Sequence, residues 1–145
     1  MDKPSEMWAM LQAYTFNKQN KERPVNHNNE WGGFSKRLNM AVFTGWRDLT
    51  HYDKETKTTT SMVLDTEWKN RPVGIPNQLF WLKHAEEHNN GIACFIIIHA
   101  VDTSVEKRKV ESIDHERVFV GKIEQRGTQY FIAGQPRELW NGTSL

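Results

Sequence analysis

The 145-residue sequence has little of what several large classes of protein require. Its single cysteine, Cys94, excludes a disulfide framework and a cysteine-based zinc cluster. No apolar run approaches the roughly 18 residues that a membrane-spanning helix needs, because the longest covers only residues 92–98. The N-terminus also lacks a basic stretch followed by an apolar one, so no secretion signal is evident. These absences predict a cytoplasmic protein in which Cys94 is a buried, inert thiol.

The sequence also has almost no net charge and no glycine-rich phosphate loop. With 19 Lys and Arg against 18 Asp and Glu, the net charge is +1, so composition alone does not indicate a nucleic-acid binder. The proportions of hydrophobic and charged residues are typical of a folded chain, and the length predicts a single domain over residues 1–145. Basic residues do gather locally, at Lys36 and Arg37 and over residues 107–109. A solvated surface is the simplest explanation of each cluster.

Hydrophobic periodicity predicts most of the secondary structure. A short helix is expected to begin with Ser5 as its cap, and a polar loop is expected over residues 17–29. Residues 30–43 are ambiguous, because two glycines oppose the short helix that their apolar spacing allows. The regular elements predicted after them are a hairpin of strands 48–53 and 58–69, a helix over 77–91 capped by Asn77, a strand over 92–101 and a second hairpin over 117–134.

The order of these elements predicts the fold class. The strand over 92–101 is apolar at nearly every position, which is typical of a central strand covered on both faces. A strand, a helix and another apolar strand in succession indicate a crossover unit with a parallel pair. The expected fold is mixed α/β, with a central mixed sheet flanked by helices and an added C-terminal hairpin.

The stretch VLDTEWK, residues 63–69, gathers charge at the end of a predicted strand. Because side chains alternate along a strand, Asp65, Glu67 and Lys69 are expected on one face. Asp48 opens the preceding hairpin strand, so antiparallel pairing is expected to bring it close to Glu67. Two carboxylates at one sheet edge are suitable ligands for Mg²⁺, and a lysine beside them could orient an attacking water. Such a site would hydrolyse phosphodiesters.

These residues, in this order, resemble the PD-(D/E)XK nuclease superfamily, and most of all its Holliday-junction-resolvase and VRR-NUC cores. The similarity covers residues 30–101. Two positions depart from the family pattern, because Arg47 stands where proline is usual and Asp65 where an aliphatic residue is usual. The motifs that carry the resemblance are Gly45-Trp46-Arg47-Asp48-Leu49, Glu67-Trp68-Lys69, and Gln78 opening a helix that contains Trp81-Leu82.

The resemblance implies a role for each matching residue. Asp48 and Glu67 would hold Mg²⁺ or Mn²⁺, with Asp65 as an extra ligand, and Lys69 would assist the water. Gln78 would be an accessory active-site residue, and Glu30 matches loosely the acid that an earlier helix often supplies. The implied partner is DNA, and a homodimer would suit a symmetric substrate. The residues expected to contact DNA are Arg47, Trp68, Arg71, Lys36 and Arg37.

A second interpretation starts from the six tryptophans, which are many for this length. A small β-rich reader domain of the PUA-like or EVE kind would bind a modified or flipped base in an aromatic pocket and catalyse nothing. Asp65 or Glu67 could then read a base edge. The side chains that could form the walls of such a pocket are Trp31, Trp46, Trp68 and Tyr130.

Two further interpretations stay open. The chain could be a non-catalytic interaction protein that keeps a nuclease-like core without activity. His84 and His88 have the i, i+4 spacing of a zinc pair on a helix, but no third ligand is evident and neighbouring glutamates indicate an exposed face.

Overall fold

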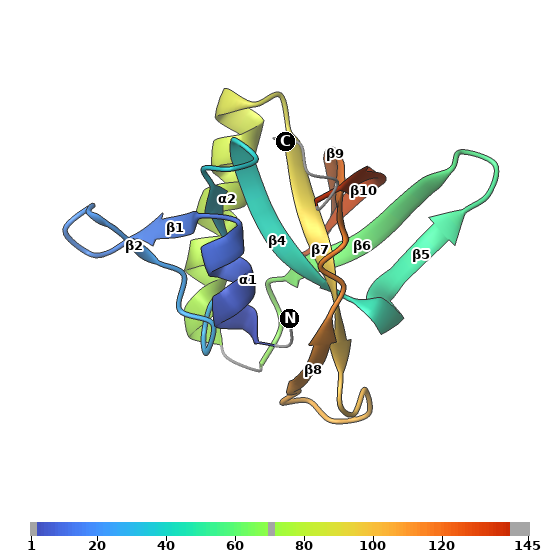
Figure 1. Cartoon of the computed structure of the whole chain (residues 1–145), viewed down its shortest axis with the longest axis horizontal. Helices are drawn as coiled ribbons and strands as arrows, with labels where there is room; N and C mark the ends of the chain where they lie inside the picture. Colours follow the sequence, from blue (N-terminus) through green and yellow to red (C-terminus); the bar gives the residue numbers. More distant parts are fainter. Residues whose placement is uncertain (1–2, 70–71, 140–145) are drawn as a thin grey trace.

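The computed structural model describes residues 3–69 and 72–139. Within these ranges the chain forms two α-helices, two short 3-10 helices and one ten-stranded sheet (Figure 1). The helical elements are α1 (Pro4–Met10), η1 (Arg47–Leu49), η2 (Pro72–Gly74) and α2 (Ile75–His88). The strands are β1 (Ala13–Phe16), β2 (Glu22–Pro24), β3 (Gly32–Ser35), β4 (Met40–Trp46), β5 (Thr50–Asp53), β6 (Thr58–Asp65), β7 (Ile92–Ala100), β8 (Val110–Ile113), β9 (Arg117–Arg126) and β10 (Gln129–Glu138).

The fold is mixed α/β, with a large and mostly antiparallel sheet. The strand order is β2-β1-β3-β4-β7-β9-β10-β6-β5, and β8 adds to β7. A parallel pair across a helical connection was predicted, and β4 and β7 form one. The predicted partner of β7 was wrong, however, because β6 pairs with β10 and β5 instead. The β5–β6 hairpin therefore stands between the two parallel strands in sequence but not in the sheet.

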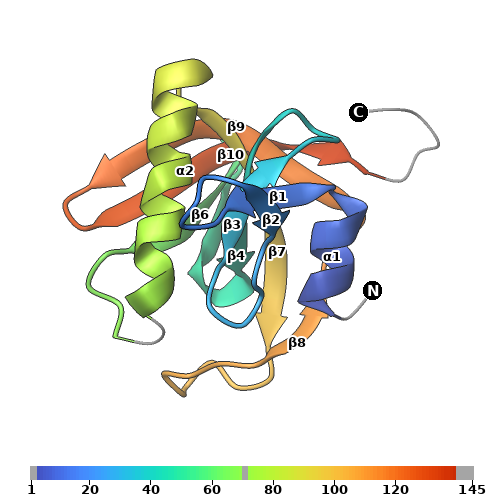
Figure 2. The same ribbon diagram turned by 90° about the vertical axis from the view of Figure 1, so that its left-hand side faces the viewer.

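Strand β7 lies at the centre of the core, as its composition predicted. Residues 93–98 are all buried, and alternate side chains enter two different apolar clusters. Cys94 and Ile96 join the cluster that contains Met7 of α1, whereas Phe95 joins the cluster that contains Leu82 of α2. Figure 2 shows the two helices at different sides of the sheet. Burial raises the pKa of the Cys94 thiol to about 12, which agrees with the inert thiol predicted.

The sheet curls back on itself between β4 and β6. Three strands separate them in the strand order, yet they are in contact. Gly45 permits this approach, because a Cβ atom there would lie 2.2 Å from the Ser61 hydroxyl oxygen. The approach places the end of β4, and η1 after it, beside the middle of β6.

Helix α2 differs from the prediction at its start. It begins at Ile75 rather than residue 77, and Gly74 occupies the N-cap position. Asn77 lies inside the helix, where its side-chain oxygen accepts a hydrogen bond from the Thr15 hydroxyl and its amide donates to the Gly32 carbonyl. The predicted Ser5 cap is also wrong, because α1 begins at Pro4. No helix in the described part of the chain is long and apolar enough to cross a membrane.

The segments without a clear period contain strands. The predicted loop over 17–29 includes β2, which pairs with β1, and the ambiguous stretch over 30–43 forms β3 and most of β4. The chain turns between β3 and β4 with Asn39 in the left-handed region (φ 55°), a conformation that asparagine tolerates. The C-terminal hairpin is confirmed, and its second strand continues beyond residue 134 to Glu138.

Candidate functional site

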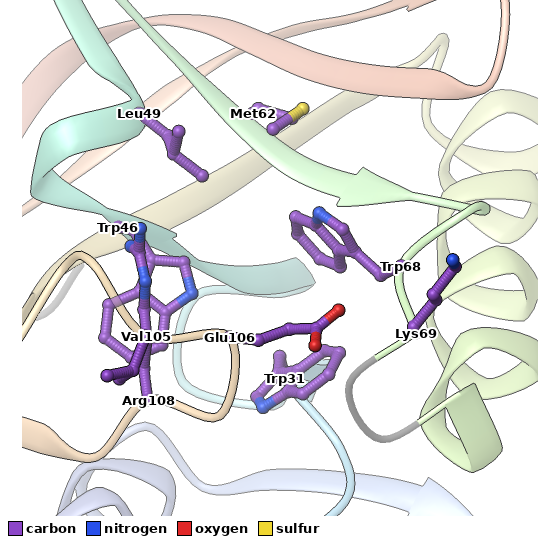
Figure 3. A pocket seen from close by; sticks show the side chains of 9 residues that line it. All are labelled: Trp31, Trp46, Leu49, Met62, Trp68, Lys69, Val105, Glu106 and Arg108. Carbon is purple, nitrogen blue, oxygen red and sulfur yellow. The ribbon is translucent and has the colours of Figure 1, made fainter.

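A pocket of about 280 Å³ opens where β4, η1 and β6 approach one another (Figure 3). Three tryptophans from three separate segments meet there. Trp31 precedes β3, Trp46 ends β4, and Trp68 follows β6. The other lining residues are Leu49, Met62, Lys69, Val105, Glu106 and Arg108. The volume lies just below the roughly 300–1,000 Å³ that is usual for small-molecule sites.

Backbone hydrogen bonds fix two of the tryptophans. The Trp31 N–H donates to the side-chain oxygen of Gln78 at 3.2 Å, and its carbonyl accepts from the Thr44 N–H at 3.0 Å. The Trp46 carbonyl accepts from the Thr50 hydroxyl at 2.7 Å. Both tryptophans are therefore tied to regular elements, which limits the entropy that a ligand would have to remove.

Trp68 is placed by the turn after β6. Its N–H donates to the Asp65 carbonyl at 3.0 Å, and its ring packs against the α2-side cluster. The rings of Trp31 and Trp68 meet edge to face, with centroids 5.8 Å apart and an interplanar angle of 85°. This geometry is a favourable one for two aromatic rings.

The Arg108 side chain covers the ring of Trp46. Its guanidinium carbon lies 5.3 Å from the centroid of the Trp46 ring, within cation–π range. Two parallel hydrogen bonds of 2.7 and 2.8 Å join the guanidinium to the Asp48 carboxylate, and a third of 2.8 Å reaches the Thr103 carbonyl. The loop between β7 and β8 is thereby attached to η1.

The pocket combines aromatic walls with a few polar groups. Glu106 and Lys69 supply two of these groups, and Figure 3 shows Lys69 at one edge of the pocket. Glu106 offers acceptors, whereas Lys69 and Arg108 carry donors and positive charge. Such a site suits a flat aromatic ligand that has a hydrogen-bond donor on its rim.

The predicted catalytic strand ends too early for its intended role. Strand β6 stops at Asp65, so Glu67 lies in the following turn and Lys69 in the irregular segment after it. The prediction of one shared strand face was therefore wrong. Asp65 itself accepts hydrogen bonds from the Glu67 N–H at 2.9 Å and from the Gln129 amide at 3.3 Å. The local turn therefore replaces the expected alternation.

Strand pairing also does not bring Asp48 beside Glu67. Asp48 lies in η1, before β5, and the β5–β6 pairing covers only Thr58–Ser61 of β6. Glu67 is exposed six positions beyond Ser61. The predicted neighbourhood of these two acids is therefore not formed by the hairpin.

The acidic residues present do not fit a two-carboxylate Mg²⁺ or Mn²⁺ site. Both oxygens of Asp48 accept hydrogen bonds from Arg108, and both oxygens of Glu30 accept hydrogen bonds from Arg23, at 2.8 and 2.6 Å. Over residues 3–69 and 72–139, no three His, Cys, Asp or Glu side chains are grouped so as to hold a metal ion. The predicted metal stays a prediction, and the described geometry does not support it.

The remaining predicted residues are dispersed. Gln78 is fully buried, and its side-chain oxygen accepts the hydrogen bond from the Trp31 N–H. Arg47 is exposed beside Trp46, whereas Lys36 lies in another hollow and pairs with Glu22 at 2.8 Å. Arg37 donates a hydrogen bond to the Leu139 carbonyl, and Arg71 lies outside the described residues.

The structure brings together three of the four predicted aromatic walls. Trp31, Trp46 and Trp68 line one pocket, but Tyr130 lines a separate hollow with Leu79 and Leu82. The loop between β7 and β8 also lines the pocket, which was not predicted. Its only signal was the basic run over 107–109, which was explained as solvated surface. The pocket residues that were not predicted are Leu49, Met62, Val105, Glu106 and Arg108.

Comparison of the chain with protein-family models, with curated proteins and with solved structures finds no match.

Proposed function

We propose that this protein is a non-catalytic reader that binds one nucleobase of a nucleic acid in the tryptophan pocket. The convergence of Trp31, Trp46 and Trp68 is the observation that carries the proposal. Nucleobases have flat π-faces, and stacking on aromatic side chains contributes about 1–3 kcal/mol per base. The base would enter from a single strand or by turning out of a duplex.

The charged residues of the pocket favour a neutral aromatic ligand over a cationic one. Aromatic cages also bind methylated ammonium groups, but here the Arg108 guanidinium already covers the Trp46 ring. Lys69 and Arg47, which are both exposed, would attract the phosphates that flank a base. The Glu106 carboxylate would accept a hydrogen bond from an N–H on the base edge.

The apolar residues of the pocket favour a methylated base. Leu49, Met62 and Val105 would contact a methyl group that the unmodified base lacks. Burial of one such group stabilises a complex by roughly 0.8 kcal/mol, which corresponds to about fourfold in affinity. A PUA-like or EVE-like architecture would agree with the mostly antiparallel sheet and with the contact between β4 and β6.

The metal-dependent DNA endonuclease predicted from sequence is a second proposal. It is supported by the order of its motif residues along the chain. The Arg108 contacts of Asp48 and the exposed position of Glu67 weigh against it. Both proposals place nucleic acid at the same side of the molecule, because Lys69 and Trp68 belong to each.

Fluorescence anisotropy with labelled oligonucleotides tests the reader proposal. Single-stranded DNA and RNA would carry one N6-methyladenine or one 5-methylcytosine, beside unmodified strands of the same sequence. We expect Trp68→Ala and Trp31→Ala to weaken binding by about tenfold or more, because each removes a stacking wall. Phe80→Ala is the matched control, since Phe80 is a half-exposed aromatic on α2 outside the pocket. Equal affinity of all three variants and the wild-type protein would overturn the proposal.

Gel assays of the same mixtures decide between the two proposals. Duplex, single-stranded and four-way-junction DNA would be incubated with Mg²⁺, Mn²⁺ or EDTA. The reader proposal expects binding without cleavage under every condition. Metal-dependent cleavage that disappears in Glu67→Ala and Lys69→Ala would support the nuclease instead.

A further inference from the structure

A second hollow, of about 210 Å³, adjoins the tryptophan pocket. Trp31, Trp46 and Arg108 line both spaces, so the two cavities share a wall. This sharing places the two hollows side by side, on either side of the same three side chains. A strand whose base fills the first pocket would therefore present its next nucleotide to the second.

The second hollow contains a buried donor that lacks an acceptor. The indole Nε1 of Trp8 is buried and has no hydrogen-bond partner among the described residues, and the whole side chain is only 3% exposed. A buried N–H without an acceptor is costly, so a ligand acceptor that reached Trp8 Nε1 would be stabilised by the hydrogen bond. Trp8 lines this hollow, where a bound group could do so.

The rim of the second hollow is rich in donors. His27, Asn28 and Lys109 line it beside Arg108. Its one carboxylate, that of Glu30, already accepts two hydrogen bonds from Arg23. The hollow therefore suits a ligand with acceptors, namely a base carbonyl or ring nitrogen within and a phosphate at the rim.

We infer that the second hollow binds the nucleotide next to the recognised base, so that the protein reads a two-nucleotide unit. This inference depends on the proposed reader function. Trp8 would donate to an acceptor on the flanking base, and Lys109 would contact the phosphate between the two nucleotides. Recognition would then depend on the neighbour of the modified base as well as on the base itself.

The test uses strands in which the neighbour can be removed. Oligonucleotides of DNA and of RNA would carry the best-bound modified base, flanked by normal nucleotides or by an abasic spacer on the 5′ or the 3′ side. We expect one of the two spacers to weaken binding to the wild-type protein by roughly two- to tenfold, the range of one lost hydrogen bond. The spacer on the other side should change affinity little.

Variants of the second hollow complete the test. Trp8→Phe keeps an aromatic ring but removes the N–H, and Lys109→Ala and Asn28→Ala change the exposed rim. We expect each variant to show a smaller difference in affinity between the strand with the spacer and the strand without it. Each should still prefer the modified base to the unmodified one. Lys18→Ala, at an exposed turn, is the control for lost positive charge. Thermal unfolding identifies any loss of folding in Trp8→Phe, in which case the two rim variants decide alone.

The outcomes separate this inference from the proposed function. A preference for the modified base that no spacer and no variant changes would overturn the second site and leave the reader intact. Absence of binding to every strand would overturn both.

Discussion

At the residue scale, the pair formed by Asp48 and Arg108 determines how the pocket is closed. The side chains are 34% and 15% exposed and form two parallel bonds, a geometry in which an ion pair can contribute to folding. The importance of the pair for the pocket is positional, because it holds the guanidinium over Trp46. We expect Asp48→Asn to weaken nucleobase binding by about two- to fivefold and to lower the free energy of unfolding by about 1 kcal/mol. Anisotropy and urea unfolding measure the two quantities.

Glu67→Gln is the matched control for that change. It neutralises an exposed carboxylate close to Trp68 in sequence but outside the lining of the pocket. The reader proposal expects Glu67→Gln to bind as the wild-type protein does. If both substitutions instead abolished a metal-dependent cleavage, the two acids would share one site and the reader proposal would be wrong.

His84 gives the molecule a pH dependence at the flank of α2, where its ring contacts those of Trp81 and Phe34. Burial among aromatic rings lowers the pKa of His84, and the nearby His88 lowers it further. The unfolded chain then binds more protons than the folded protein below the ordinary pKa of 6.5. The free energy of unfolding should therefore decrease as pH falls through 6.5, until the folded histidine also becomes protonated.

Urea unfolding between pH 5 and 8 measures this dependence. The contribution of His84 is the difference between the wild-type protein and His84→Gln, which cannot be protonated in this range. We expect the difference in free energy of unfolding to favour the wild-type protein more at pH 8 than at pH 5. A difference that is constant across the range would contradict the lowered pKa.

At the element scale, the sequence predicted the strongly periodic segments and missed those controlled by local hydrogen bonds. Strand β7 and helix α2 were predicted because their apolar spacing is clear. Strand β6 was extended four residues too far, because its alternation continues to Lys69 whereas the Asp65 side chain ends it in a turn. Strand β3 was missed because its two glycines weaken the prediction of any regular element. Glycine is nevertheless needed in a strand where a neighbouring chain segment leaves no room for a Cβ atom. Gly33 has such a neighbour, because a Cβ atom there would lie 2.7 Å from the Tyr14 carbonyl.

The contact between β4 and β6 depends on one small residue in each strand. Gly45→Ala would place a methyl group against the Ser61 side chain and close to the Phe95 ring. We expect it to lower the free energy of unfolding by about 1–3 kcal/mol through overpacking. Ser61→Gly removes the atoms that clash, so the double variant should be more stable than the sum of the two single changes predicts.

A double-mutant cycle in urea tests this expectation. Ser61→Gly alone also loses a hydroxyl 2.9 Å from that of Thr50, so its own cost must be measured first. Additive effects would mean that Gly45 and Ser61 do not restrain each other, and the sheet would then curl for another reason.

At the scale of the whole molecule, the pocket could be predicted only in part because its walls meet through long-range contacts. The polar surroundings of Trp31 and Trp68 in the sequence indicated that they could stack on a base. Their meeting with Arg108 depends on the strand order, in which β4 lies beside β7 and β7 leads to the loop over 101–109. A single sequence contains no local signal for that order. Because β7 was predicted to pair with the strand before α2 rather than with β4, the loop that follows β7 was not expected to reach the pocket.

The two apolar clusters share β7, and this arrangement predicts how the molecule unfolds. Alternate residues of β7 enter opposite clusters, so loss of either cluster removes support from the same strand. Leu11, which caps the C-terminus of α1, and Leu82 of α2 are a matched pair, one in each cluster and both almost fully buried. We expect Leu11→Ala and Leu82→Ala each to lower the free energy of unfolding by about 2–5 kcal/mol.

Both variants should also keep a single transition, with far-ultraviolet circular dichroism and tryptophan fluorescence changing together. Val101→Ala is the control, because Val101 is 62% exposed and its truncation should have little effect. If Leu11→Ala separated the two probes while Leu82→Ala did not, the α1 side would unfold independently of β7. The clusters would then be separate cooperative units, and a ligand in the tryptophan pocket, whose walls pack on both clusters, would be expected to couple them.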